Sequence, residues 1–318
     1  MTTAEVTSHP IKLNADAVLV KPQSLWRMAL RRFLRHRAAL MGTVILFGVI
    51  LYIVVGSLRF SEAQANHNDT SLRLNPPSAE HPFGTDVVGR DILKRTIYGG
   101  QISLVIGLFA VLVEVGLGTI VGALSGYYGG WIDSMLMRLT EAMLSIPQLL
   151  LLLVMAKFFS DKVPDLHLFG RTFSGSVVVI IIILGLTSWM YLARIVRSNF
   201  LSLRESEFIT AARALGASNA RIILVHILPN TLAPIIVAAT LGIASAILSE
   251  SYISFLGLGV RPPTASWGNM LDGAYQYLEE APWLWIFPGL LVILTVLSIN
   301  FVGDGLRDAL DPRSDKKV

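Results

Sequence analysis

The segment Glu205-Ser-Glu-Phe-Ile-Thr-Ala-Ala-Arg-Ala-Leu-Gly216-Ala-Ser-Asn-Ala-Arg-Ile-Ile-Leu-Val-His-Ile-Leu-Pro229 is polar and helix-prone, and it lies between two long apolar stretches. An apolar stretch of about 20 residues spans a bilayer, so a segment between two of them lies on one membrane face. Gly216 suits the left-handed position that ends a helix, and Ser218 suits the cap of the next one. Pro229 is expected to close the unit before the following span. The paired alanines let another surface approach closely, so the segment is predicted to bind a protein.

The composition indicates that most of the chain lies in lipid. Hydrophobic residues make up 53% of the 318 residues and charged residues only 15%, whereas a soluble domain has about 25% charged residues. The chain has no cysteine, which excludes disulfide scaffolds, thiolate metal sites and cysteine nucleophiles. The formal charge of +4 does not indicate nucleic-acid binding, because the basic residues lie beside the apolar stretches and set membrane orientation.

Six apolar stretches predict an all-α integral membrane protein with six transmembrane helices. They are residues 38–58, 101–125, 134–158, 176–195, 231–251 and 283–302. The first begins far from Met1 and no small-residue cleavage site follows it, so it is expected to be a retained anchor. The predicted parts are an N-terminal segment (1–37), the first span (38–58), an outer loop (59–100), a five-span core (101–304) containing the loop 196–230, and a tail (305–318).

Lysine and arginine beside the spans predict that both termini and the loop 196–230 are cytoplasmic. Apolar side chains also recur at helical spacing before the first span, which predicts an elbow helix lying in the headgroup region. Those apolar residues are Trp26, Leu30, Phe33 and Leu34. The basic residues are Arg27, Arg31, Arg32, Arg35 and Arg37 before the first span, Arg194, Arg197, Arg204, Arg213 and Arg221 around the loop, and Arg307, Arg313, Lys316 and Lys317 after the last span.

The loop 59–100 is predicted to be extracytoplasmic although it carries basic residues. Loops this long follow the positive-inside rule weakly, and acidic residues balance the charge. The basic residues are Arg59, Arg73, Arg90, Lys94 and Arg95, and the acidic ones are Glu62, Asp69, Glu80, Asp86 and Asp91.

A DNA-reading helix-turn-helix has a similar glycine turn between two short helices. Its recognition helix must present polar side chains to base edges, whereas the second helix here, Ile222-Ile-Leu-Val-His-Ile-Leu228, is nearly all apolar. No third helix is available to complete a core, so no nucleic acid is expected as a partner. A plain amphipathic connector would need neither the paired alanines nor the glycine.

The segment 205–229 resembles the "EAA" loop of ABC importer permeases, whose pattern is Glu-Ala-Ala, three residues, Gly, nine residues, Ile-x-Leu-Pro. Two positions depart from it: Thr210 replaces the glutamate and His226 replaces the isoleucine. In that family the loop forms a coupling helix that seats in a groove of the ATP-binding subunit. The resemblance therefore implies an ATPase contact made by Glu207, Thr210, Ala211, Ala212, Arg213, Gly216, Ala217, Leu228 and Pro229.

Further blocks resemble the dipeptide/oligopeptide permeases of the C-subunit type, from about residue 25 to residue 313. They are residues 81–91, 98–104, 126–133, 254–263 with Trp267-Gly268, and 303–312. The resemblance implies the type I ABC importer permease fold and a multi-pass protein of a bacterial or archaeal plasma (inner) membrane. It also implies a second homologous permease subunit, two ATP-binding subunits and an extracytoplasmic substrate-binding protein. Peptides are the default substrate, with nickel chelates, glutathione and oligosaccharides as alternatives.

Glycines at a predicted cytoplasmic turn and within the second span carry two further expectations. Gly129, Gly130 and Asp133 are expected to make a second, smaller coupling contact, although a simple inter-helix turn explains these residues equally well. Gly118, Gly122 and Gly126 repeat every fourth residue and predict a small face for close helix packing.

The outer loop after the fifth span contains Pro262, Pro263 and Trp267. The prolines stiffen the loop, and the tryptophan suits a membrane interface. Such a loop is expected either to cap the outer mouth of a pathway, to receive a binding protein, or to anchor the chain at the interface.

Polar residues within the spans are candidates for the transport pathway. Glu114 is the main one, with Glu141 and Asn300 as weaker ones. A charged side chain at mid-membrane costs about 2.5–3.5 kcal/mol on insertion scales, so Glu114 is expected to face protein or water. The alternative is a buried neutral carboxyl bonded to a neighbouring helix.

No catalytic motif is present: the chain lacks His-Glu-x-x-His, Gly-x-Ser-Gly and a glycine-rich loop ending in Gly-Lys-Ser/Thr. The histidines are scattered, so neither a metal site nor a cofactor is expected. We predict a permease subunit of an ATP-driven importer for peptides or a related small solute, with hydrolysis on separate subunits. The alternative is a self-sufficient secondary transporter or channel, which would need paired intramembrane charges or broken helices and an inverted repeat.

Overall fold

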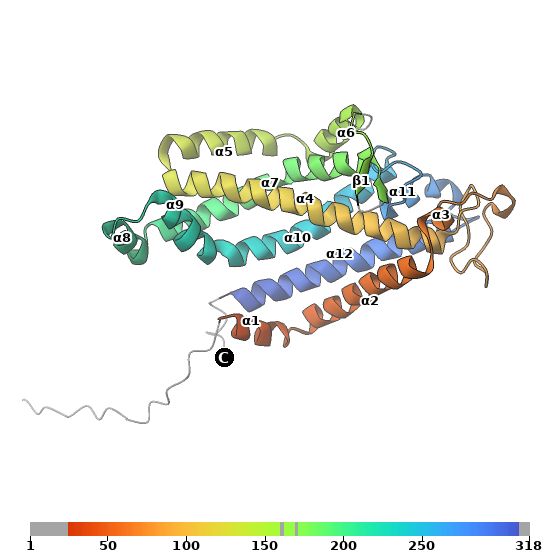
Figure 1. Cartoon of the computed structure of the whole chain (residues 1–318), viewed down its shortest axis with the longest axis horizontal. Helices are drawn as coiled ribbons and strands as arrows, with labels where there is room; N and C mark the ends of the chain where they lie inside the picture. Colours follow the sequence, from red (N-terminus) through yellow and green to blue (C-terminus); the bar gives the residue numbers. More distant parts are fainter. Residues whose placement is uncertain (1–24, 160–161, 169–170, 312–318) are drawn as a thin grey trace, which may run out of the picture.

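The computed structural model describes residues 25–159, 162–168 and 171–311. Within these ranges, the helices lie along a common direction in an elongated bundle (Figure 1). Five of the helices are long and apolar enough to cross a membrane, and a bent helix pair passes the same test of length and composition when it is taken together as one broken span. The prediction of a six-span all-α fold is therefore confirmed. The five are α2 (Arg37–Arg59), α4 (Ile92–Tyr128), α7 (Gly175–Arg204), α10 (Leu228–Phe255) and α12 (Trp283–Leu310); the bent pair is α5 (Gly130–Leu144) and α6 (Gln148–Phe159).

The third span is bent, where the sequence predicted one continuous helix over residues 134–158. The axes of α5 and α6 meet at 84° across a short break. Pro147 lies in that break, has no N–H to donate, and disfavours helical geometry at Ile146 before it. Hydropathy did not reveal the bend because both halves are apolar.

Several helices extend beyond the predicted spans. Helix α4 begins at Ile92, where the Asp91 carboxylate accepts a hydrogen bond from the Lys94 amide at 3.1 Å, so the outer loop ends before the predicted residue 100. Helix α7 continues to Arg204 and α12 to Leu310, so helical structure extends into the regions predicted as the loop from residue 196 and the tail from residue 305. Hydropathy marks where lipid ends, and a helix with polar residues continues past that point.

The small face of α4 packs against α7, as predicted. A Cβ atom added at Gly122 would lie 2.5 Å from the Ala193 carbonyl oxygen, and one added at Gly126 would lie 2.6 Å from the Phe200 Cβ atom. Gly118 approaches the backbone of the same helix at Trp189. Inside a membrane the lipid is as apolar as the side chains, so the hydrophobic effect does not drive helices together. Close packing of their backbones stabilises the helix pair instead.

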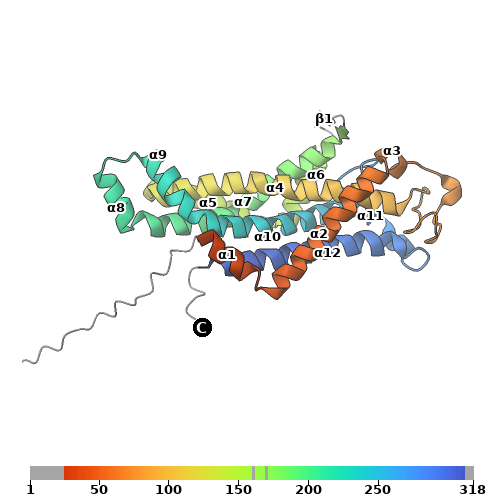
Figure 2. The ribbon, with the colours of Figure 1, turned by 60° about the horizontal axis from the view of Figure 1, so that its bottom comes forward.

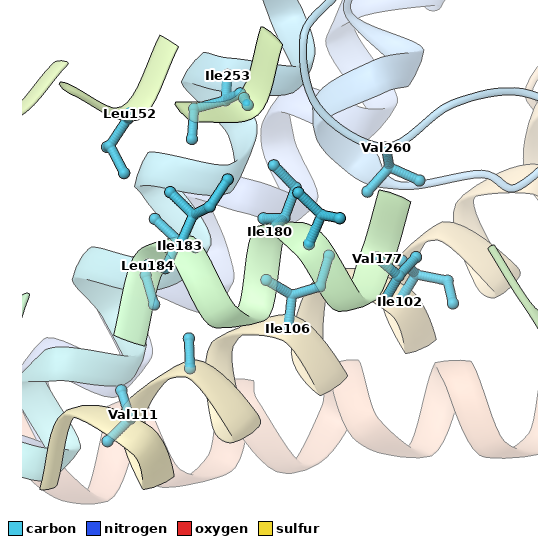
Figure 3. Close-up of a cluster of buried hydrophobic side chains, with 14 residues drawn as sticks. Ile102, Ile106, Val111, Leu152, Val177, Ile180, Ile183, Leu184, Ile253 and Val260 are labelled. Atoms are coloured by element: carbon cyan, nitrogen blue, oxygen red, sulfur yellow. The ribbon is translucent and has the colours of Figure 1, made fainter. Parts of the chain in front are cut away.

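A buried apolar cluster joins the same two helices to α6 and α10. Figure 3 shows Ile102 and Ile106 from α4 facing Ile180 and Ile183 from α7, with Ile253 of α10 above them. Helices α4, α7 and α10 therefore form the packed centre of the bundle, and α2 and α12 lie together along one side (Figure 1).

One end of the bundle carries α1 (Leu25–Phe33), the last turns of α12, α8 (Glu207–Ala214) and α9 (Asn219–Arg221) (Figures 1 and 2). An Arg32 guanidinium nitrogen donates to the Asp311 carbonyl at 2.9 Å, which fixes the predicted elbow helix to the end of α12. This end is the cytoplasmic one by the arginines around it. The predicted contributions of Arg313, Lys316, Lys317 and the Trp26 side chain lie outside the described residues.

The opposite end carries α3 (Glu62–Ala65), η1 (Thr70–Leu72), α11 (Trp267–Met270) and η3 (Ala274–Tyr277), together with one strand pair. The pair, β1 (Leu166–Leu168) and β2 (Arg171–Phe173), is antiparallel and was not predicted. The expected charge balance of the first outer loop appears as ion pairs: Arg90 with Asp86 at 2.7 Å and Lys94 with Asp91 at 3.4 Å.

The outer segment, which we define as residues 256–277, folds back onto α4. The expectation that Trp267 lies at a membrane interface is wrong, because this side chain has no exposed surface and its indole nitrogen donates to the Thr96 carbonyl at 2.8 Å. Gly99 and Gly100 leave the space for it: a Cβ at Gly100 would lie 2.6 Å from the indole ring. Trp267 is therefore buried in the space that Gly99 and Gly100 leave beside α4, although tryptophan often lies at membrane interfaces.

Candidate functional site

Helix α8 is a short helix at the cytoplasmic end of the bundle (Figure 2), and its C-terminus is closed by backbone hydrogen bonds. Gly216 follows it with φ +82°, as predicted for a left-handed terminator. The Ala217 amide donates to the Ala212 carbonyl at 3.0 Å and the Gly216 amide to the Arg213 carbonyl at 2.9 Å. These two bonds form a Schellman motif, which satisfies the carbonyls at the end of the helix.

The second half of the loop continues directly into the fifth span. The Ser218 hydroxyl accepts from the Arg221 amide at 3.4 Å, which confirms the predicted cap of α9. A π-helical stretch, η2 (Ile222–Ile227), then joins α9 to α10. Pro229 therefore does not close the unit as expected: the helix runs unbroken from Asn219 to Phe255. The π-turn shifts the hydrogen-bonding register by one residue just before the proline, which has no N–H to donate.

The loop is held to the body of the protein through the end of α4. The Tyr127 hydroxyl donates to the Asn219 side-chain oxygen at 2.7 Å, and Arg204 donates to the Tyr127 carbonyl at 3.1 Å. Ile209 of α8 has no exposed surface and packs in one apolar cluster with Tyr127 and Phe200. Helix α8 thus has one buried anchor and otherwise faces outward.

Most of the residues predicted to contact an ATPase share the outward face of the loop. Glu207, Thr210, Ala211, Arg213, Gly216 and Pro229 are exposed, and Ala212, Ala217 and Leu228 are half-buried. Thr210, in place of the family's glutamate, donates its hydroxyl to the Ser206 carbonyl at 3.3 Å within its own helix.

Sequence reasoning missed the two large apolar side chains on this face. Leu215, at the tip of the loop, is 89% exposed, and Phe208 is 45% exposed. The available signal was an apolar residue directly before a helix-ending glycine in an otherwise polar loop. Together these two side chains give the outward face of α8 an apolar surface in an otherwise polar loop.

The turn between α4 and α5 contains the residues predicted for a second contact. Gly129 and Gly130 both have positive φ, +67° and +54°. Asp133 accepts two hydrogen bonds from Arg197, at 2.5 and 2.6 Å, and a further one from the Ser125 hydroxyl. The carboxylate of Asp133 therefore holds the turn against α7, while the two glycines lie at the outward bend.

Glu114 lines a cavity of about 540 Å³ at the break of the third span. The residues of the break, Ser145 to Gln148, form one wall, and the other walls are α7 with Ser188 and α10 with Gly242 and Ser245. Gly242 leaves room for the carboxyl group, since a Cβ there would lie 3.2 Å from a Glu114 oxygen. The lining residues include one carboxyl group and no lysine, arginine or histidine.

The two weaker pathway candidates do not line this cavity. Glu141 is exposed on α5, and Asn300 is half-buried on α12. No group of three or more metal-ligating side chains occurs within the described ranges.

A buried carboxyl group that sequence reasoning did not identify lies near the outer end of α10. Glu250 has no exposed surface and accepts hydrogen bonds from the hydroxyls of Ser254 at 2.6 Å, Ser266 at 2.7 Å and Ser103 at 3.1 Å. The signal was an acidic residue inside the predicted span 231–251, where a charge requires polar partners.

Comparisons with known proteins give matches over nearly the whole chain. The model of the family "Binding-protein-dependent transport system inner membrane component" matches residues 118–316, and that of the "N-terminal TM domain of oligopeptide transport permease C" matches residues 24–77. The chain is 43% identical to the dipeptide transport system permease protein DppC of Alkalihalophilus pseudofirmus, covering 98% of this chain and 96% of that protein. It is 38% identical to the oligopeptide transport system permease protein OppC of Escherichia coli K12, covering 98% and 99%.

Among solved structures, an inward-facing conformation of the MetNI methionine ABC transporter matches with a TM-score of 0.53 and 20% identity. The match covers 69% of this chain and 98% of that one. At this identity the likeness concerns the fold, which is that of an ABC importer permease.

Proposed function

We propose that this chain, which belongs to the family of inner-membrane components of binding-protein-dependent transport systems, imports di- or oligopeptides as one half of an ATP-driven permease. Members of this family are multi-pass inner-membrane permease subunits, and ATP hydrolysis belongs to separate subunits. The peptide substrate is supported by relatives named as dipeptide and oligopeptide permeases at 38–43% identity. The secondary-transporter alternative does not fit this family, although the broken helix expected of such a transporter is present in α5 and α6.

The observation that carries the proposal is the exposed helix α8, which ends in a Schellman motif at Gly216. Leu215 and the small residues Ala211 and Gly216 form an outward surface that fits a groove of an ATP-binding subunit. An ATPase that displaces α8 would also displace α4 and α10. Tyr127 joins the loop to α4, and the loop continues without a break into α10. The ATPase shifts the permease between its states only if this contact is stronger in one state than in the other.

The complete assembly would contain a second homologous permease subunit, two ATP-binding subunits and an extracytoplasmic binding protein. Gly129 and Gly130 provide the second, smaller contact with the ATPase, at the same end of the bundle as α8 (Figure 1).

The test is copurification in mild detergent followed by native mass spectrometry to count the retained subunits. Leu215→Glu is expected to lose the ATPase while the permease stays folded, since the leucine side chain is almost fully exposed. Gly216→Pro is expected to lose it as well, because proline cannot adopt a positive φ. Leu278→Glu, an exposed leucine at the outer end of the bundle, is the matched control and should retain the ATPase. Retention of the ATPase by all three variants would contradict the proposed contact.

The transport pathway is proposed to pass the cavity beside Glu114. Irregular backbone at membrane depth is tolerated only where it is buried in protein or lines a water-filled cavity, and the break at Pro147 lines this one together with Glu114. The test measures uptake of a labelled dipeptide by the Glu114→Gln variant. Glu141→Gln, which lies outside the cavity, is the control. A change in uptake with Glu114→Gln alone supports the proposal, and equal uptake by both variants contradicts it. Competition by nickel chelates, glutathione or oligosaccharides would identify an alternative substrate.

A further inference from the structure

The Glu250 cluster, which we define as Glu250, Ser103, Ser254 and Ser266, joins three separate parts of the chain. Ser103 belongs to α4, Glu250 and Ser254 belong to α10, and Ser266 belongs to the outer segment. All four side chains are buried, and Glu250 is the one described ionisable residue with no exposed surface. No part of the proposed transport mechanism uses this carboxyl group.

Each serine hydroxyl of the cluster donates one hydrogen bond and accepts another. It donates its proton to the Glu250 carboxylate, and its oxygen accepts from a backbone amide of the outer segment. The accepting pairs are Ser254 from Val260 at 3.1 Å, Ser266 from Asn269 at 3.1 Å, and Ser103 from Trp267 at 3.2 Å. A hydroxyl has one proton to donate and lone pairs to accept, so this arrangement satisfies all three serines.

One carboxylate therefore orients the outer segment at three points, in addition to the Trp267 indole bond to Thr96 of α4. Glu250 aligns three hydroxyls, and these hydroxyls bind backbone amides at positions 260, 267 and 269. Gly268 passes directly over the cluster, since a Cβ there would lie 2.7 Å from the Ser251 Cα atom and 3.1 Å from a Glu250 oxygen. The segment therefore cannot shift relative to α10 without breaking these bonds.

The helix that carries Glu250 also reaches the cytoplasmic loop. It runs without interruption from Asn219 to Phe255, so Glu250 lies about 45 Å from the start of the loop's second helix at 1.5 Å per residue. The helix is continuous over this length, so its cytoplasmic and outer ends are mechanically connected. A displacement of the loop by an ATPase therefore reaches the outer segment through Glu250.

We propose that Glu250 is a positioning residue that makes the outer segment move with α10, so that events on the outer face and at the cytoplasmic loop are coupled. The inference rests on the proposed function, in which a binding protein docks outside and an ATPase docks inside. Coupling between two binding sites is reciprocal. Docking of the binding protein on a correctly held outer segment favours the same permease state that the ATPase drives.

The experiment compares wild type, Glu250→Gln, Glu250→Asp and Glu250→Ala in the full importer reconstituted in lipid vesicles. ATPase activity is measured while the concentration of the peptide-loaded binding protein of the same system is varied. We expect the basal ATPase rate to stay within twofold of wild type in every variant. The binding-protein concentration for half-maximal stimulation should rise at least tenfold with Glu250→Ala and less with Glu250→Asp, which retains the carboxylate.

A second measurement reports on the outer segment alone and does not depend on the binding protein. The chain has no cysteine, so a single Ala265→Cys substitution provides one thiol at a position that is 4% exposed. Labelling by a membrane-impermeant maleimide should accelerate at least tenfold when Glu250→Gln is added. Tyr275→Cys, already 60% exposed, is the control and should label equally fast in both backgrounds.

The outcomes distinguish a failure of the proposed function from a failure of the role assigned to Glu250. Wild-type vesicles without binding-protein-stimulated ATPase activity would overturn the proposed function and this inference with it. Normal stimulation in wild type together with unchanged half-maximal concentrations in the Glu250 variants would overturn the inference alone, as would unchanged labelling of Ala265→Cys. If Glu250→Ala does not assemble, Ser266→Ala removes one bond to the carboxylate and should change both readouts in the same direction.

Discussion

Replacement of Gly216 by alanine tests the geometry of the coupling loop most directly. An alanine Cβ at this position would meet no atom within 4 Å, so any effect comes from the backbone. The φ of +82° lies in the left-handed region, where an L-residue with a Cβ is less stable than glycine by roughly 1–2 kcal/mol. That free energy corresponds to a change of about 5–30-fold in an equilibrium constant.

The measurement is hydrogen–deuterium exchange of the loop in the purified protein, followed by mass spectrometry of peptides that cover α8. Because the Schellman bonds of the Gly216 and Ala217 amides close the helix, Gly216→Ala should accelerate exchange of the α8 amides about 5–30-fold. Gly216→Asn should have a smaller effect, since asparagine visits the left-handed region more readily than alanine. Exchange in α4 and α7 should not change.

The control is Gly116→Ala in α4. Its Cβ would also meet nothing within 4 Å, and its φ is not positive. Alanine is the better helix former by about 1 kcal/mol, so this variant should be neutral or stabilised. Unchanged α8 exchange in Gly216→Ala, or equal acceleration in both variants, would refute the assignment of Gly216 as the helix terminator.

Three further substitutions test the packing that supports the loop and the outer segment. Gly122→Val places its Cβ about 2.5 Å from the Ala193 carbonyl oxygen and should lower unfolding free energy by about 1–3 kcal/mol in detergent melts; an unchanged melting temperature would argue against close α4–α7 packing. Arg197→Lys cannot reproduce the bidentate pair with Asp133 at 2.5 and 2.6 Å, so the backbone amides of residues 129–133 should exchange their hydrogens faster. Exchange at the wild-type rate would show that this pair does not hold the turn against α7. Trp267→Phe removes the indole hydrogen bond of 2.8 Å and should cost about 1 kcal/mol, whereas a stabilised variant would show that the bond contributes nothing.

The sequence alone predicted the features that depend on local chemistry. The spans followed from hydropathy, the left-handed Gly216 from helix-ending preferences, and the close-packing face of α4, though not its partner α7, from glycines at every fourth residue. Each of these signals lies within one short stretch, so no knowledge of distant residues was needed.

Features that depend on contacts between distant residues could not be predicted. Trp267 was expected at an interface because nothing local shows that Gly99 and Gly100, far away in the sequence, leave a slot for it. The importance of Glu250 depends on serines from α4 and from the outer segment. The bend at Pro147 is the exception, since the proline was visible, yet prolines also occur inside α10 and α12 without breaking them.

The arrangement of the helices explains why one loop can control one cavity. Helices α4 and α7 are joined by close glycine packing, and α10 is tied to α4 near its outer end through the Glu250 cluster. The cytoplasmic loop is attached to both, through Tyr127 to α4 and by direct continuation to α10. The cavity beside Glu114 has walls from α4, α7 and α10. In the proposed mechanism, a force on α8 changes the position of the cytoplasmic part of α10 relative to the α4–α7 pair, and with it the width of the cavity. The break of the third span at Pro147 completes the wall of this cavity, and the two helices on either side of it run in directions 84° apart.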